Sequence, residues 1–398
     1  MLVAMLSIAL FGRSRISSSI LPDVFLVVGY SSLLVIQQFF IPGGTFNFGL
    51  NFFVATVAAF MPCWMIRTTE RYCPHITKPI QSGIMVLFWV AFLSIATSFL
   101  FGIGERYANG GILGARAFGL LGDSFSPVNV FLVLFFIFNR QFTFAAMVVV
   151  LMLMTGGKSA LLMLIISLML HIFFVSRSVV AKIFLAVGML ILALFQFEMV
   201  DILNSVQNFQ FSFNNRLFSI EVGLNYFREN PWFGIGINQA LHRIGDDVDA
   251  LARQLGETQY FPVYQIHNAY IRSLAETGAI GFMCLAGLVL FWVSKSVGAI
   301  RVARGVPRSV ERSITLASSY WIISFTLAYQ STGWFLSGHP QLAWLLIFFT
   351  FSTLFSAQLK MTRTVTQWSQ DTTGLEEQAG KKERCPKLTQ AQVRGPFA

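Results

Sequence analysis

The 398-residue chain is 55% hydrophobic, carries only 12% charged residues and has a formal net charge of +10. The charged share is about half of that in a usual soluble domain. A soluble fold could not bury this much apolar surface. The positive residues stand in short blocks between apolar runs, as they do in the loops of membrane proteins, and this argues against a nucleic-acid partner. We therefore predict an all-α integral membrane protein, since lipid requires backbone polar groups to be paired internally.

Apolar runs of a length that suits a bilayer recur along the chain. A span needs about 20 residues, and the runs predict a polytopic bundle of about 10–11 transmembrane helices, with residues 1–11 as the candidate eleventh. The membrane-embedded domain is then residues 1–358, and the polar residues 359–398 form a disordered cytoplasmic tail. The ten predicted spans are residues 21–41, 49–66, 82–103, 125–138, 142–155, 159–175, 182–199, 270–294, 313–331 and 340–358.

Basic residues fall in alternate loops, which assigns those loops to the cytoplasmic side. The outer loops include one long segment, residues 200–269, and a segment of this length is usually functional. Within it, residues 214–229 have helical spacing, with Asn214 or Asn215 as the expected cap, and predict an amphipathic helix at the membrane surface. The last inner loop contains Lys295, Arg301, Arg304, Arg308 and Arg312.

Cationic residues also stand in the outer loops, where the positive-inside bias does not require them. A polyanionic ligand such as a pyrophosphate would explain them, because arginine binds phosphate oxygens bidentately. The alternative is pairing with nearby carboxylates, as Arg272 would pair with Glu276 four residues later. Lys158 opens an apolar helix, whose N-terminus favours anions. The outer cations are Arg106, Arg116, Lys158, Arg216, Arg228, Arg243, Arg253 and Arg272.

His267 stands where the long segment re-enters the membrane. Histidine exchanges a proton near neutral pH, so His267 is a candidate base, although a lone histidine is more often structural. The acidic run at 246–249 lacks EF-hand spacing and is interpreted as a solvated turn. The four cysteines have no CxxC spacing and no nearby histidine pair, and we expect neither a metal site nor a disulfide framework. No other cofactor is expected.

Three short motifs follow one another along this part of the chain: NPWFGIG at 230–236, His267-Asn268, and ETGAIG at 276–281. Together they resemble the O-antigen ligase/polymerase superfamily. The run RAFG at 116–119 is similar to the family's Arg-x-x-Gly loop. Lys158 stands where the family has arginine, and Arg216 matches the arginine that precedes the Asn-Pro motif.

The resemblance implies glycosyl transfer at the periplasmic face of a bacterial inner membrane. Donor and acceptor would both be glycans linked to undecaprenyl diphosphate, and no metal would be needed. The resemblance assigns catalysis to His267 and Arg216, and diphosphate binding to Arg116, Lys158, Arg216 and Arg272. It implies supporting roles for Asn268, Tyr270, Glu276, Gly234 and Gly236.

Short outer loops around one long segment favour a polymerase of O-antigen or exopolysaccharide repeat units. A ligase that transfers O-antigen to lipid A-core is the first alternative. A transporter of bicarbonate or another anion is the second. A flippase and a chain-length regulator are candidate protein partners, together with membrane lipid.

Overall fold

The structure of this protein is a computed structural model, in which the regular structure of the described residues is helical. Within the part of the chain that the structure describes, two stretches, Thr77–Thr97 and Ala269–Arg304, are long and apolar enough to cross a bilayer. The described part contains helices and no strands, and the predicted all-α membrane fold is confirmed. The structure describes residues 29–30, 32–33, 35–36, 39, 76–101, 126–155, 158–176, 178–180, 183, 188, 206–256, 266, 268–328 and 345–360.

Most of the predicted spans that can be compared coincide with a helix to within a few residues. Residues 49–66, most of 21–41 and 182–199, and the tail from 361 onward lie outside the described residues. The helices are α4 (Thr77–Phe101), α5 (Ser126–Phe138), α6 (Phe142–Thr155), α7 (Lys158–Val175), α9 (Val206–Glu229), α10 (Gln239–Gln254), α11 (Ala269–Arg304), α12 (Val310–Ala328) and an unlabelled helix, Leu345–Lys360.

The surface helix α9 is longer than predicted. It begins at Val206, so Asn214 and Asn215 lie in its interior and the prediction that one of them caps it was wrong. Residues 206–213 contain neither glycine nor proline, and no residue there breaks a helix. The spacing of apolar residues from Leu217 onward therefore identified only the second part of the helix.

The acidic run at 246–249 is helical as well, which corrects the expectation of a turn. It lies within α10, where Ile244, Val248 and Ala252 recur every four residues and are buried. This period places Asp246 and Asp247 on the exposed face. The acids are therefore the solvated side of an amphipathic helix.

Helix α12 is buried on nearly all sides and packs against α5, α7 and α11. Aromatic rings fill the space beside it. Phe131 and Phe348 stack with ring centroids 4.2 Å apart, and Trp321 meets Phe348 at 4.6 Å. The Trp321 indole donates a hydrogen bond to the Pro127 carbonyl of α5 at 2.6 Å, which satisfies its one polar atom inside the bundle.

Helices α9 and α10 pack together around their own small apolar core. Phe218 and Val222 of α9 pack with Ile244 and Val248 of α10 in this cluster. Tyr226 donates a hydrogen bond to Asp247 and so links the two helices at the edge of the core. Burial, reinforced by this carboxylate, raises the pKa of Tyr226 above its usual value and keeps the hydroxyl a donor.

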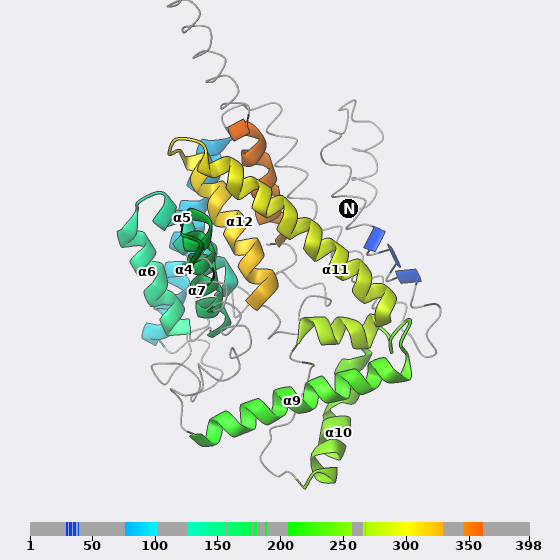
Figure 1. The fold of residues 1–398 in the computed structure, drawn as a ribbon. Coiled ribbons are helices and arrows are strands. Elements are labelled where there is room, and N and C mark those ends of the chain that lie inside the picture. The colour runs from blue at the N-terminus through cyan, green and yellow to red at the C-terminus, as the bar shows by residue number, and fades with distance from the viewer. Residues whose placement is uncertain are drawn as a thin grey trace, which may run out of the picture.

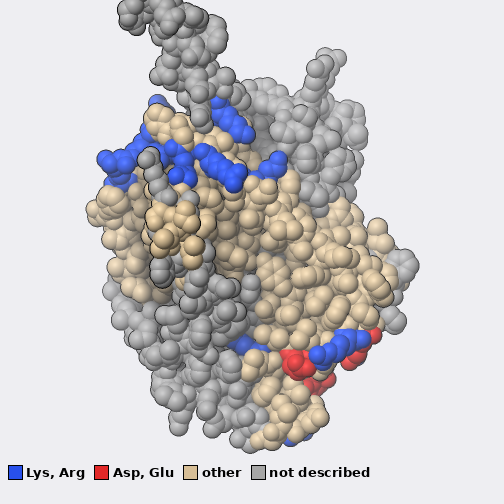
Figure 2. All heavy atoms as spheres, in the orientation of Figure 1, with Lys and Arg blue, Asp and Glu red and all other residues tan. Residues whose placement is uncertain are grey.

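Charged side chains divide the molecule into two ends. Lys and Arg gather where α11 ends and α12 begins, whereas α9 and α10 lie at the opposite end (Figures 1 and 2). The predicted inner loop and the predicted outer segment thus occupy opposite ends of the bundle. Exposed cations at the basic end include Lys295, Arg301, Arg304 and Arg308.

Candidate functional site

The long helix α11 is interrupted at Gly278, whose backbone is not helical (φ 63°, ψ −169°). Before this break its first turns contact α9, and beyond it the helix crosses toward the basic end of the molecule (Figure 1). A regular helix would bond the amides of Ala279 and Ile280 to the carbonyls of Ala275 and Glu276. The break separates these four groups.

The loop at 230–236 supplies partners for all four separated groups. Its Pro231 and Trp232 carbonyls accept hydrogen bonds from the Ala279 amide at 2.8 Å and the Ile280 amide at 3.3 Å. Its Ile235 and Gly236 amides donate to the Ala275 carbonyl at 2.9 Å and the Glu276 carbonyl at 3.0 Å. We call this arrangement, the loop at 230–236 bonded into the break of α11 at 275–280, the joint.

Two glycines allow the two backbone segments of the joint to approach this closely. A Cβ on Gly234 would lie 2.6 Å from the Ala275 carbonyl oxygen, and a Cβ on Gly278 would lie 2.6 Å from the Gly234 amide nitrogen and overlap the Trp232 carbonyl. Both residues also have positive φ, 70° and 63°. The joint therefore admits no side chain at either position.

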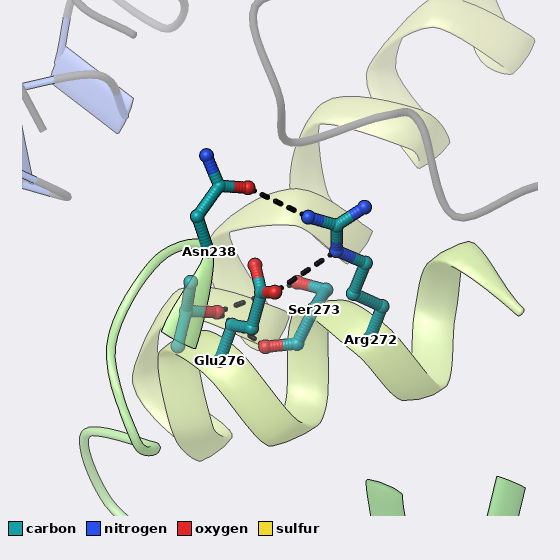
Figure 3. A network of polar contacts seen from close by, with 5 residues as sticks. Asn238, Arg272, Ser273 and Glu276 are labelled. Atoms are coloured by element: carbon teal, nitrogen blue, oxygen red, sulfur yellow. Dashed lines mark hydrogen bonds and ion pairs between the residues drawn. The ribbon is translucent and has the colours of Figure 1, made fainter. Parts of the chain in front are cut away.

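A buried ion pair lies directly beside the joint. The Arg272 Nε donates to Glu276 Oε1 at 3.0 Å, and the two side chains are only 4% and 0% exposed. Arg272 Nη2 also donates to Asn238 Oδ1 at 2.7 Å (Figure 3). The predicted pairing of Arg272 with Glu276 is thus present, and the bond to Asn238 ties α11 to the residue that precedes α10.

Asn238 was not identified from the sequence, although it closes this network. It precedes α10 in the left-handed conformation, with φ 63°, which asparagine tolerates better than most residues. This backbone turns the chain from the joint into α10 and directs the amide toward Arg272 (Figure 3). Its hydrogen bond with Arg272 joins residues 34 apart in the sequence, and no local sequence pattern predicts such a contact.

The start of α11 is fixed on both sides of His267, which itself lies outside the described residues. Asn268 caps the helix, because its Oδ1 accepts from the amides of Tyr270 and Ile271, each at 3.0 Å. The Tyr270 hydroxyl donates to the Thr326 carbonyl at 2.7 Å and joins this end of α11 to α12. On the other side of His267, Ile266 is fully buried.

Ile266 is held by α9. A Cβ on Gly223 of that helix would lie 3.1 Å from Ile266 Cδ1 and 2.8 Å from Ile271, so the two segments meet where α9 has no side chain. Arg216 stands seven residues before Gly223, about two turns, and so lies on the same face of α9. Its side chain is half-buried. The α9 face that bears Arg216 therefore meets Ile266, the residue before His267, and Ile271 of α11.

The structure describes only some of the other predicted site residues. Lys158 is the first residue of α7, as predicted, and its side chain is not among those described. Arg116 lies outside the described residues. Gly234 and Gly236 belong to the joint. Among the described residues, no group of three or more His, Cys, Asp or Glu side chains could hold a metal ion.

Residues 142–286 match the family model described as O-antigen ligase. The matched segment runs from α6 to just beyond the break in α11, and it contains α9, α10 and the joint. This segment is similar to the O-antigen ligase family. No curated protein matches the chain significantly.

This O-antigen ligase match confirms the resemblance drawn from the motifs. It supports a ligase-type or polymerase-type function, the work of glycosyltransferase-like enzymes in a membrane. It lends no support to the alternative of an anion or bicarbonate transporter. The described residues of the three motifs lie in the joint and at the start of α11.

Replacing Gly278 with alanine is expected to lower the free energy of unfolding by about 3 kcal/mol, because the new Cβ meets the loop backbone at a φ suited to glycine. The matched control is Gly287→Ala on the same helix, where a new Cβ would meet nothing within 4 Å and the change should stay below about 1 kcal/mol. Thermal unfolding of both purified variants in detergent measures the difference. Equal midpoints would contradict the backbone arrangement of the joint.

Glu276→Gln is expected to destabilise the protein by about 3–5 kcal/mol, because it leaves the Arg272 guanidinium buried without a countercharge. Glu221→Gln is the matched control, since it breaks an exposed pair with Arg228 at 3.1 Å that contributes less than about 1 kcal/mol. A double variant, Arg272→Met with Glu276→Leu, should recover much of the loss. Unfolding midpoints of the four proteins test this, and a Glu276→Gln variant as stable as Glu221→Gln would refute it.

Proposed function

We propose that the protein is a polymerase that joins undecaprenyl-diphosphate-linked oligosaccharide repeat units into a surface polysaccharide, either O-antigen or exopolysaccharide. One observation carries the proposal. The start of α11 packs against α9, and Ile266, the residue before His267, meets Gly223 on the helix face that bears Arg216. A base and a diphosphate-binding cation are the two groups that this transfer needs.

The reaction at this site needs no metal. His267 accepts the proton of an acceptor hydroxyl, and the oxygen forms a bond to the anomeric carbon of the donor glycan. The bond between that carbon and the diphosphate oxygen breaks, and its electron pair leaves with undecaprenyl diphosphate. The proton on His267 then passes to solvent or to the leaving group.

The cations Arg216, Arg116 and Lys158 would stabilise the charge that develops on the departing diphosphate. Support is strongest for Arg216, which lies on the face of α9 that meets the start of α11. Arg272 is bound by Glu276 and Asn238. These contacts favour a structural role for Arg272 at the joint over the binding of a lipid carrier.

The charge distribution supports a periplasmic site in a bacterial inner membrane. Exposed Lys295, Arg301, Arg304 and Arg308 lie at the end opposite α9 and α10. Cytoplasmic loops carry an excess of such residues, so the α9 end would face the periplasm, where lipid-linked glycans are assembled after export. The basic end would offer a surface for a flippase or a chain-length regulator.

A ligase is the second candidate, because the matching family model carries that description. A ligase would move the glycan to lipid A-core, whereas a polymerase leaves a longer glycan on undecaprenyl diphosphate. Short outer loops around the single long segment favour the polymerase. Separation of the lipid-linked and lipid A-linked products of the purified protein, supplied with both acceptors, distinguishes the two activities.

His267→Ala and Arg216→Ala are each expected to lower polymer yield by roughly 100-fold or more, because one removes a general base and the other a stabilising cation. Arg228→Ala is the matched control on α9, since that side chain pairs with Glu221 at the surface. Yields should be measured on purified protein at equal amounts with confirmed folding. Full polymer from His267→Ala would remove that residue from the mechanism.

A further inference from the structure

Two large aromatic side chains are exposed at the joint. Trp232 is 64% exposed and Phe233 is 41% exposed, although both belong to the loop at 230–236, whose backbone is bonded into α11. Exposed tryptophan is uncommon on a surface that faces only water. The surfaces on either side of these two side chains indicate which environment they face.

The backbone that carries these side chains is rigidly attached. The Trp232 carbonyl accepts from Ile280 and the preceding Pro231 carbonyl accepts from Ala279, while Gly234 donates from its amide to the Asn230 carbonyl at 2.8 Å. The two aromatic rings therefore project from a fixed platform. Their position relative to α11 follows from the joint and not from a free loop.

On one side of the platform begins an exposed apolar surface of α11. Met283 is 61% exposed and Leu290 is 69% exposed, in a helix long and apolar enough to span a bilayer. The surface ends at exposed Lys295, whose ammonium lies 5.5 Å from the centre of the Phe291 ring. Gly278 and Lys295 are about 26 Å apart along the helix, close to the roughly 30 Å of a hydrocarbon core.

On the other side of the platform lie charged residues of α9. Glu221, Arg228 and Glu229 are exposed, and Figure 2 shows acidic and basic side chains in a band below the broad uncharged surface. Trp232 and Phe233 thus stand between a lipid-facing helix and a water-facing one. Tryptophan is enriched at this boundary, because its ring is apolar and its N–H is polar.

We propose that Trp232 and Phe233 insert into the boundary between headgroups and acyl chains of the bilayer leaflet on the α9 side, with phospholipid as their partner. Because their backbone is bonded to α11, this contact sets the depth of the joint in the membrane. The buried pair Arg272–Glu276 and the cap of α11 are then held just outside the hydrocarbon core. The proposal depends on the membrane fold and is independent of the reaction catalysed.

The test uses full-length protein with its four native cysteines replaced by serine, a single cysteine introduced at Trp232, and an environment-sensitive fluorophore attached there. Leu255→Cys is the matched control, since Leu255 is 62% exposed but lies at the far end of α10, away from α11 (Figure 1). Both proteins are reconstituted into phosphatidylcholine–phosphatidylglycerol vesicles. Quenching is measured with nitroxide lipids labelled near the headgroup or deep in the acyl chain, and with aqueous iodide.

The label at position 232 should be quenched several-fold more by the shallow nitroxide than the label at position 255, with the order reversed for iodide. A label at Phe233→Cys should behave as the one at 232 and provides the readout if Trp232→Cys fails to fold. Strong iodide quenching at 232 and 233, without lipid quenching, would overturn the proposal. Stronger quenching by the deep nitroxide than by the shallow one would also overturn it, because the rings would then lie in the hydrocarbon core.

Discussion

The exchange of backbone hydrogen bonds at the joint is the interaction on which the rest of this structure depends. A break inside a helix leaves amides and carbonyls unpaired, and such groups are costly to bury near lipid. Here the loop at 230–236 returns a partner to each of them. The helix keeps its hydrogen bonding while changing direction, and α9 and α10 are attached to the bundle by main-chain contacts.

The ion pair beside the joint fits the same view. A buried salt bridge contributes little net stability, because desolvation of the two charges offsets most of their attraction. The ion pair contributes more to the specificity of the fold than to its stability. Arg272 binds both a carboxylate of its own helix and the Asn238 amide before α10. A different orientation of α10 would leave the guanidinium short of an acceptor. The network therefore selects one arrangement of α10 relative to α11.

Much of the bundle could be predicted from the sequence, because apolar runs such as 125–138 and 142–155 must become helices in lipid. The pairing of Arg272 with Glu276 was also predictable, since their spacing of four is local. The joint was not, because residues 230–236 and 275–280 meet across a long stretch of chain. Only the resemblance drew attention to Gly278. Asn238 gave no local signal, and the start of α9 at Val206 was missed because its early residues lack a clear apolar period.

Gly234 and Gly278 leave unusually little freedom for sequence change. In most cores a larger side chain at one position can be accommodated by a smaller one at its neighbour. Here the obstacle to a Cβ is the peptide backbone of the opposite segment, which every amino acid carries. No second substitution can make room, so each glycine is constrained by itself. Divergent sequences that keep this joint should retain both glycines even where the surrounding side chains have all been replaced.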